Sequence, residues 1–196
     1  MTKLINLPDA LFRVFKEEKY AIEFIHKGEF RFGKLAYYRN IEDDARMDDT
    51  EGCGRYFDHQ NVQHDFELGN PIYLFCCTVP DVDLNYLRER FGQFIVRINN
   101  PQLFVQQTEV YLATQGVHTF NGIHGDTVKY TKGTKFDQEL DSTQRAKLSL
   151  IQKPAGYHRE SEYRFFTILK HDSECPPQAF LKINLGQSLR YAEMLP

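Results

Sequence analysis

The chain lacks a strong excess of charge of either sign, since it carries 24 Lys and Arg against 27 Asp and Glu in 196 residues. A strongly basic balance, which is typical of nucleic-acid-binding proteins, is therefore absent. The longest apolar run, Ile72–Val79, is far too short to span a membrane. Met1–Ala10 has no charged stretch followed by a long apolar stretch, so we expect no secretory signal.

Cysteines are few, and none of Cys53, Cys76, Cys77 and Cys175 belongs to a C-x-x-C pair. We therefore expect a reduced protein in the cytoplasm. Cys76 and Cys77 are adjacent in an apolar run and should point to opposite faces of a strand. That setting is wrong for the exposed, activated thiol of a cysteine hydrolase.

The common catalytic and phosphate-binding motifs are missing, including G-x-G-x-x-G, G-x-x-x-x-G-K-[ST], G-x-S-x-G and H-E-x-x-H. His59 and His64, beside Asp58 and Asp65, match no strong metal-ligand spacing, and we expect no metal.

Aromatic residues are abundant, with 16 Phe and 11 Tyr, and 41% of the residues are hydrophobic. This composition predicts one domain over residues 1–196 with a sizeable core. Charge is distributed unevenly along it. Glu42–Glu51 holds six acids and one arginine, whereas Thr127–Lys170 has nine Lys and Arg against five acids. One interpretation is that both segments are ordinary solvated surface. The alternative is that the basic segment binds an anionic ligand or a nucleic-acid backbone.

Short strands and helices alternate irregularly, which favours an α+β fold over a doubly wound sheet. The pattern predicts strands over Leu11–Phe15, Glu29–Leu35, Ile72–Val79, Gln93–Ile98, Glu162–Leu169 and Ala179–Asn184. It predicts helices over Glu18–Lys27, Asp81–Arg90, Pro101–Thr114 and Asp137–Leu150. Asn121-Gly122 predicts a hairpin that joins Val117–Phe120 to Thr127–Tyr130.

Two glutamates precede the late hydrophobic strand in Tyr157–Phe166, YHRESEYRFF. On extended backbone, Glu160 and Glu162 would point the same way, because the side-chain period of a strand is two. Arg159 and Arg164 are candidate cations beside them. A strand edge protected by exposed charges would explain the same pattern without any catalytic role.

Three elements occur in an order that resembles the ADP-ribosyltransferase superfamily. They are an early strand carrying Arg13, a middle stretch G-x-F-x-F-G-x-L-x-Y-Y-R over Gly28–Arg39, and this late E-x-E. The resemblance extends over Leu11–Leu169. It implies two small packed, mostly antiparallel sheets with flanking helices. It also implies NAD as a substrate, no metal, and transfer of ADP-ribose to a macromolecule.

The neighbourhood of Arg46 is similar to the DarT branch of nucleic-acid-modifying toxins, in which a segment after the middle strand carries a catalytic arginine. This resemblance implies a bacterial or phage toxin or defence effector. RNA or DNA is then slightly favoured over protein as the acceptor, and an antitoxin protein would be a partner.

The candidate roles follow from residue chemistry. Cleavage of the nicotinamide–ribose bond passes through an oxocarbenium-like state, which a carboxylate at Glu162 would stabilise. Glu160 would activate or orient the acceptor. Arg13, or else Arg46, would bind the diphosphate of NAD, because the guanidinium matches phosphate oxygens. Further candidates for holding NAD are Tyr37, Tyr38 and Arg31. Each of these residues is also explained as an ordinary surface or core residue with no role in binding or catalysis.

Two other functions explain the same sequence. One is a non-catalytic module that senses a nucleotide or a phage component and binds NAD without consuming it. The other is a metal-dependent nuclease that uses Asp126, Glu160 and Glu162.

Overall fold

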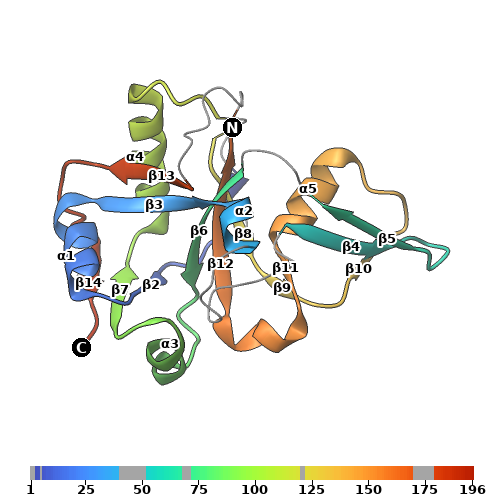
Figure 1. The fold of residues 1–196 in the computed structure, drawn as a ribbon, viewed down its shortest axis with the longest axis horizontal. Helices are drawn as coiled ribbons and strands as arrows, with labels where there is room; N and C mark the ends of the chain where they lie inside the picture. Colours follow the sequence, from blue (N-terminus) through green and yellow to red (C-terminus); the bar gives the residue numbers. More distant parts are fainter. Residues whose placement is uncertain (1–2, 5, 40–51, 68–71, 120–121, 170–178) are drawn as a thin grey trace.

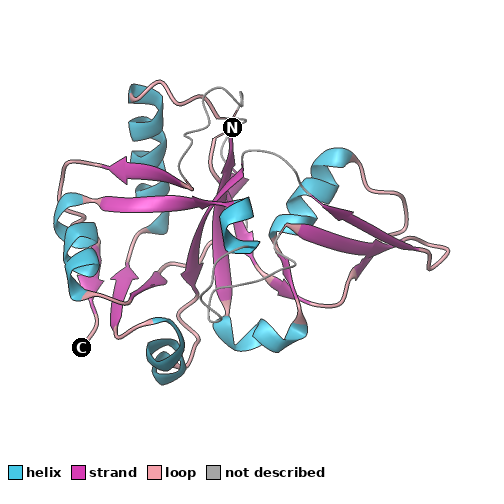
Figure 2. Cartoon of the chain, viewed as in Figure 1, coloured by secondary structure: helices cyan, strands magenta, loops and turns pink. Residues whose placement is uncertain are grey.

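The computed structural model describes residues 3–4, 6–39, 52–67, 72–119, 122–169 and 179–196. Its centre is a nine-stranded sheet in which the strands run in the order β1-β8-β12-β6-β2-β7-β14, with β3 and β13 branching from β6 (Figures 1 and 2). These strands are β1 (Lys3–Leu4), β2 (Leu11–Phe15), β3 (Glu29–Lys34), β6 (Ile72–Thr78), β7 (Phe94–Ile98), β8 (His124–Thr127), β12 (Glu162–Ile168), β13 (Phe180–Asn184) and β14 (Ala192–Met194). The α+β class is confirmed, whereas the strands form one large branched sheet and smaller ones instead of two small sheets.

Strand β6 is the point at which the large sheet divides. Along one edge it pairs with β12 over its whole length, from Ile72 to Thr78. Along the other edge it meets β2 only at Thr78, and β3 only at Tyr73 and Leu74. In the described part of the chain, the middle of β6 therefore has a strand on one side only. The diverging β2 and β3 leave an opening there.

Helices α1 (Glu18–Lys27) and α4 (Pro101–Thr114) cover the branch that carries β3 and β13 (Figure 1). Both ends of α1 are as predicted, and Gly28 stops it at φ 64°, a left-handed conformation that glycine adopts without strain. Asn100 caps α4 as predicted, since its side chain accepts a hydrogen bond from the Leu103 N–H at 2.9 Å. A third helix, α3 (Leu84–Phe91), begins at Leu84, after its N-cap Asp83, instead of at the predicted Asp81.

A cluster of phenylalanines fills the space between these helices and the sheet. Phe24 of α1 and Phe104 of α4 lie with ring centroids 6.0 Å apart, and Phe75 of β6 lies 5.4 Å from Phe104. All three are buried. Burial of such rings supplies much of the hydrophobic stabilisation of the fold, and it fixes β6 below the opening.

A smaller lobe lies beyond β12 (Figure 1). It contains β4 (Cys53–Phe57), β5 (Gln63–Glu67), β10 (Thr134–Lys135) and helix α5 (Ser142–Leu150), together with the short parallel pair β9 (Lys129–Tyr130) and β11 (Gln152–Lys153). The amide of Gln152 accepts from the Arg55 N–H and donates to the Arg55 carbonyl, both at 3.0 Å. This buried side chain joins β11 to β4. The sequence pattern predicted β9 only as part of the hairpin arm Thr127–Tyr130, and it did not predict the other short strands.

Two predicted elements differ from the structure. The predicted hairpin is wrong, because β8 pairs with β12 and β1, while Thr119 forms an isolated bridge with Leu169. The predicted helix over Asp137–Leu150 begins only at Ser142, after Asp141 and Gln144 form a reciprocal capping box. Two short helices were also not predicted, α2 (Leu35–Arg39) and the 3-10 helix η1 (Ala155–Glu160).

None of the helices in the described ranges has both the length and the apolar character needed to cross a membrane. Cys53, Cys76 and Cys77 form no disulfide within the described residues, and Cys175 lies outside them. Cys76 and Cys77 pack against different hydrophobic clusters, in agreement with the expectation that they point to opposite faces of β6.

Candidate functional site

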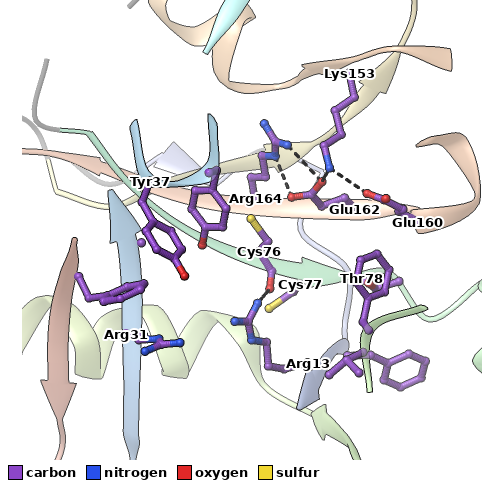
Figure 3. Close-up of a pocket in the computed structure, with 16 residues that line it drawn as sticks. Arg13, Arg31, Tyr37, Cys76, Cys77, Thr78, Lys153, Glu160, Glu162 and Arg164 are labelled. Atoms are coloured by element: carbon purple, nitrogen blue, oxygen red, sulfur yellow. Dashed lines mark hydrogen bonds and ion pairs between the residues drawn. The ribbon is translucent and has the colours of Figure 1, made fainter. Parts of the chain in front are cut away.

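The opening between β2 and β3 is the mouth of a pocket above β6 and β12 (Figure 3). Its lining includes six of the seven residues predicted for the NAD site: Arg13, Arg31, Tyr37, Tyr38, Glu160 and Glu162. The seventh, Arg46, lies outside the described residues, as does the acidic segment Glu42–Glu51. Residues from separate elements thus meet in one pocket. Glu162 and Arg164 form its charged floor.

Glu162 is the first residue of β12 and lies opposite Thr78 of β6. Its side chain is 7% exposed. Its Oε1 accepts a hydrogen bond from Arg164 Nε at 2.8 Å, and Oε2 accepts from Arg164 Nη2 at 3.2 Å. The backbone N–H of Glu162 donates to the Tyr130 hydroxyl at 2.7 Å, which fixes the start of the strand.

Arg164 was predicted as a neighbouring cation, and it is wholly buried. It lies two residues after Glu162 on β12, so both side chains project from the same face of the sheet. Its Nη1 donates to the carbonyl of Leu150 at 2.9 Å, at the last residue of α5. Arg164 therefore connects the glutamate to the C-terminal end of a helix, where a positive charge is favourable.

Lys153 is the residue that the sequence pattern missed. Its ammonium lies 2.8 Å from Oε2 of Glu160 and 3.0 Å from Oε2 of Glu162, and it bridges the two carboxylates (Figure 3). It is carried into the site by β11, whose pairing with β9 is not local in sequence. The general basic excess of Thr127–Lys170 was its only signal.

Glu160 reaches the site by a route different from the predicted one. It ends η1, and Ser161 then adopts a left-handed conformation at φ 44° before β12 begins. The backbone between the two glutamates is therefore not extended, and Lys153 brings their carboxylates together. Arg159 points elsewhere, toward Asp83 at 3.6 Å and over the ring of Tyr86.

The two glutamates differ in acidity. Burial alone would raise the pKa of Glu162, but the guanidinium of Arg164 and the ammonium of Lys153 hold that pKa well below its usual range. Burial raises the pKa of Glu160, and Lys153 only partly opposes this effect. Glu162 is therefore a permanent anion at neutral pH, while Glu160 holds its proton more readily.

This difference predicts an acid-sensitive fold. Because the pKa of Glu162 is lower in the folded than in the unfolded state, its contribution is present above the unfolded pKa and is lost as pH falls. Between about pH 6 and pH 3, we expect urea denaturation to show a smaller loss of unfolding free energy in Glu162→Gln than in wild type. Glu139→Gln, at an exposed position, should follow wild type. Equal losses in all three proteins would contradict the ion pairing described here.

Arg13 enters the opening from β2. It donates from Nη1 to the carbonyl of Cys76, in the stretch of β6 that lacks a strand partner on this side within the described residues. Its guanidinium lies 4.7 Å from the ring centroid of Phe75, a cation–π distance. Its buried Nε has no hydrogen-bond partner among the described residues. Arg13 thus lines the pocket with a guanidinium whose donors are not all used within the described residues.

An aromatic wall closes the side of the pocket formed by β3 and α2 (Figure 3). The rings of Tyr37 and Phe180 pack edge to face with centroids 4.6 Å apart, and the guanidinium of Arg31 lies 4.0 Å from the centroid of Phe180. Gly33 makes room for Tyr38, since a Cβ there would lie 2.6 Å from the Tyr38 hydroxyl. A flat ring entering the pocket would meet aromatic faces.

Charge in the pocket lining is unbalanced, unlike that of the whole chain. Lys153 and Arg164 are paired with Glu160 and Glu162. No carboxylate of the described residues forms an ion pair with Arg13 or Arg31, the other two cations of the lining. The pocket therefore offers two positive charges to an anionic ligand.

The other predicted chemistries find less support. Burial raises the pKa of the Cys77 thiol to about 12, so it is not an activated nucleophile. Asp126, required by the nuclease hypothesis, accepts a hydrogen bond from Asn6 at 3.0 Å and forms an ion pair with Lys147 at 3.3 Å. His64 bonds Asp58 at 3.0 Å and stacks on Tyr56. Across the described ranges, no group of three or more His, Cys, Asp or Glu side chains is placed to hold a metal ion.

Comparison with known proteins returned no matching family model, no matching curated protein and no matching solved structure.

Proposed function

We propose that this chain binds NAD in the pocket between β2, β3, β6 and β12, cleaves the nicotinamide–ribose bond and transfers ADP-ribose to a macromolecule. The observation that carries the proposal is the convergence of Arg13, the Tyr37–Tyr38 wall and Glu162 on one pocket from distant parts of the sequence. These are the three chemical functions that the reaction needs: a partner for the diphosphate, a surface for the nicotinamide ring and an anion beside the ribose.

In this proposal, the developing positive charge on the ribose is stabilised by the ionised carboxylate of Glu162. A buried carboxylate that is already oriented stabilises the transition state strongly, because it needs no reorganisation during the reaction. Arg164 supplies that orientation through its two hydrogen bonds. Glu160 lies at the edge of the same cluster, and its raised pKa makes it the better proton acceptor for an incoming nucleophile.

Nicotinamide is a flat ring that would stack against Tyr37 or Tyr38. The diphosphate would accept hydrogen bonds from the guanidinium of Arg13, which lines the pocket and forms no ion pair with a described carboxylate, and Arg31 would assist from the mouth of the pocket. We propose RNA or DNA as the acceptor, because Lys129, Lys132 and Lys135 are exposed in the segment around β9 and β10, and β9 pairs with the strand that carries Lys153.

The role of Arg13 gives a direct test by calorimetry. Arg13→Leu should weaken NAD binding about ten-fold or more, because a charged hydrogen bond to the diphosphate is lost. Arg97→Leu, at an exposed position on the neighbouring strand β7, should bind like wild type. Equal affinities of the two variants would remove Arg13 from the site, and no NAD binding by wild type would refute the proposal.

One observation favours the second candidate, a non-catalytic nucleotide-binding module. The carboxylate of Glu162 is already engaged by Arg164 and Lys153, as a structural ion pair would be. The two candidates differ in turnover. Binding of NAD without release of nicotinamide over hours would support the module, while release above a protein-free blank supports the enzyme.

A further inference from the structure

Oε2 of the Glu162 carboxylate has no free capacity for another hydrogen bond. A carboxylate offers about four acceptor positions. Arg164 occupies one on each oxygen, and Lys153 occupies a second on Oε2. A ribose hydroxyl can bind Oε2 of Glu162 only if one of these donors withdraws.

Lys153 is the donor best able to withdraw. Arg164 is buried, planar and fixed at three points, the third being the Leu150 carbonyl. Lys153 instead approaches on a flexible stem from β11, a strand of two residues. Its ammonium also lies 5.1 Å from the ring centroid of Tyr157, so it has a favourable contact on the side of η1.

An anionic ligand would draw this ammonium away, while a neutral one would not. A phosphate group beside the ribose competes with Glu162 for the lysine charge and replaces the bond that Lys153 gives up. A nucleoside without phosphate must break the Lys153–Glu162 contact without that compensation. The same pocket would therefore treat the two ligands differently, although both present the same ribose and the same nicotinamide.

We propose that Lys153 is a positioning residue that determines specificity: it covers Glu162 in the empty pocket and releases it to ligands that carry phosphate next to the nicotinamide ribose. This inference rests on the proposed function. It explains why the pocket bridges its two glutamates with a lysine instead of a second arginine, since an arginine fork would hold them in a fixed geometry.

The test compares kcat/KM for nicotinamide release from NAD and from nicotinamide riboside. Wild type should prefer NAD. In Lys153→Met, the preference should fall about ten-fold, mainly through a lower KM for nicotinamide riboside, because that ligand no longer displaces a charged donor. Lys27→Met, at an exposed position of α1, should keep the wild-type preference. Lys153→Gln, which retains a donor for the glutamates without the charge, serves as a second variant if the methionine variant does not fold.

An unchanged preference, or an equal loss of both activities, would overturn the role of Lys153 while leaving the proposed function intact. If wild type cleaves neither compound, the proposed function itself is refuted, and this inference with it.

Discussion

Replacing Glu162 by glutamine is expected to lower kcat for nicotinamide release from NAD by about 10²–10³-fold, with a smaller effect on KM. The neutral amide keeps the size of the side chain but cannot offset positive charge on the ribose. The site would lose an interaction that is strong only in the transition state, and such a loss lowers kcat. Released nicotinamide, separated by chromatography and detected by mass, gives both constants.

The exposed position Glu139 provides the matched control, since Glu139→Gln should release nicotinamide at the wild-type rate. A melting temperature for Glu162→Gln close to that of wild type would show that the fold survives. Equal rates for wild type and Glu162→Gln, both above a protein-free blank, would show that another residue carries the reaction.

The second large effect concerns stability. Arg164→Leu should lower the free energy of unfolding by about 3–5 kcal/mol, because it leaves the buried carboxylate of Glu162 without its main partner. The variant also removes the donor to the Leu150 carbonyl at the end of α5. Urea denaturation at neutral pH measures the loss. Arg159→Leu, whose side chain is 56% exposed, should change stability by less than about 0.5 kcal/mol.

A double variant separates the ion pair from packing. Adding Glu162→Gln to Arg164→Leu should restore part of the lost stability, because the uncompensated buried charge is then removed. If Arg164→Leu is as stable as Arg159→Leu, the buried pair is not what holds the first residue of β12 against the sheet.

Local signals explain which elements the sequence could predict. Helix α4 has Asn100 and Pro101 at its start, and helix α1 has Gly28 at its end, so both bounds follow from neighbouring residues. Strand β6 is a continuous apolar run, typical of a strand that is buried on both faces. The predicted hairpin was wrong because β8 is selected by its distant partner β12, and the Asn121-Gly122 turn signal carries no information about that partner.

The residues of the candidate site also fall into those that local sequence signals indicate and those that they do not. Arg13, Glu160 and Glu162 belong to short motifs, and their residue types alone indicate the chemistry. Lys153 has no motif. Its position depends on the pairing of β11 with β9 and on the contact between Gln152 and Arg55, which only the folded lobe brings together. Prediction from sequence therefore identified the two glutamates and missed the lysine that bridges them.

The most direct test of the central claim is a crystal structure of Glu162→Gln, the variant expected to turn over slowly, with NAD bound. We expect the nicotinamide ring against Tyr37 or Tyr38, the ribose beside residue 162 and the diphosphate within hydrogen-bonding distance of Arg13. We also expect that Lys153 has left its contact with residue 162. NAD bound elsewhere on the molecule, or an empty pocket at saturating NAD, would contradict the proposed NAD site.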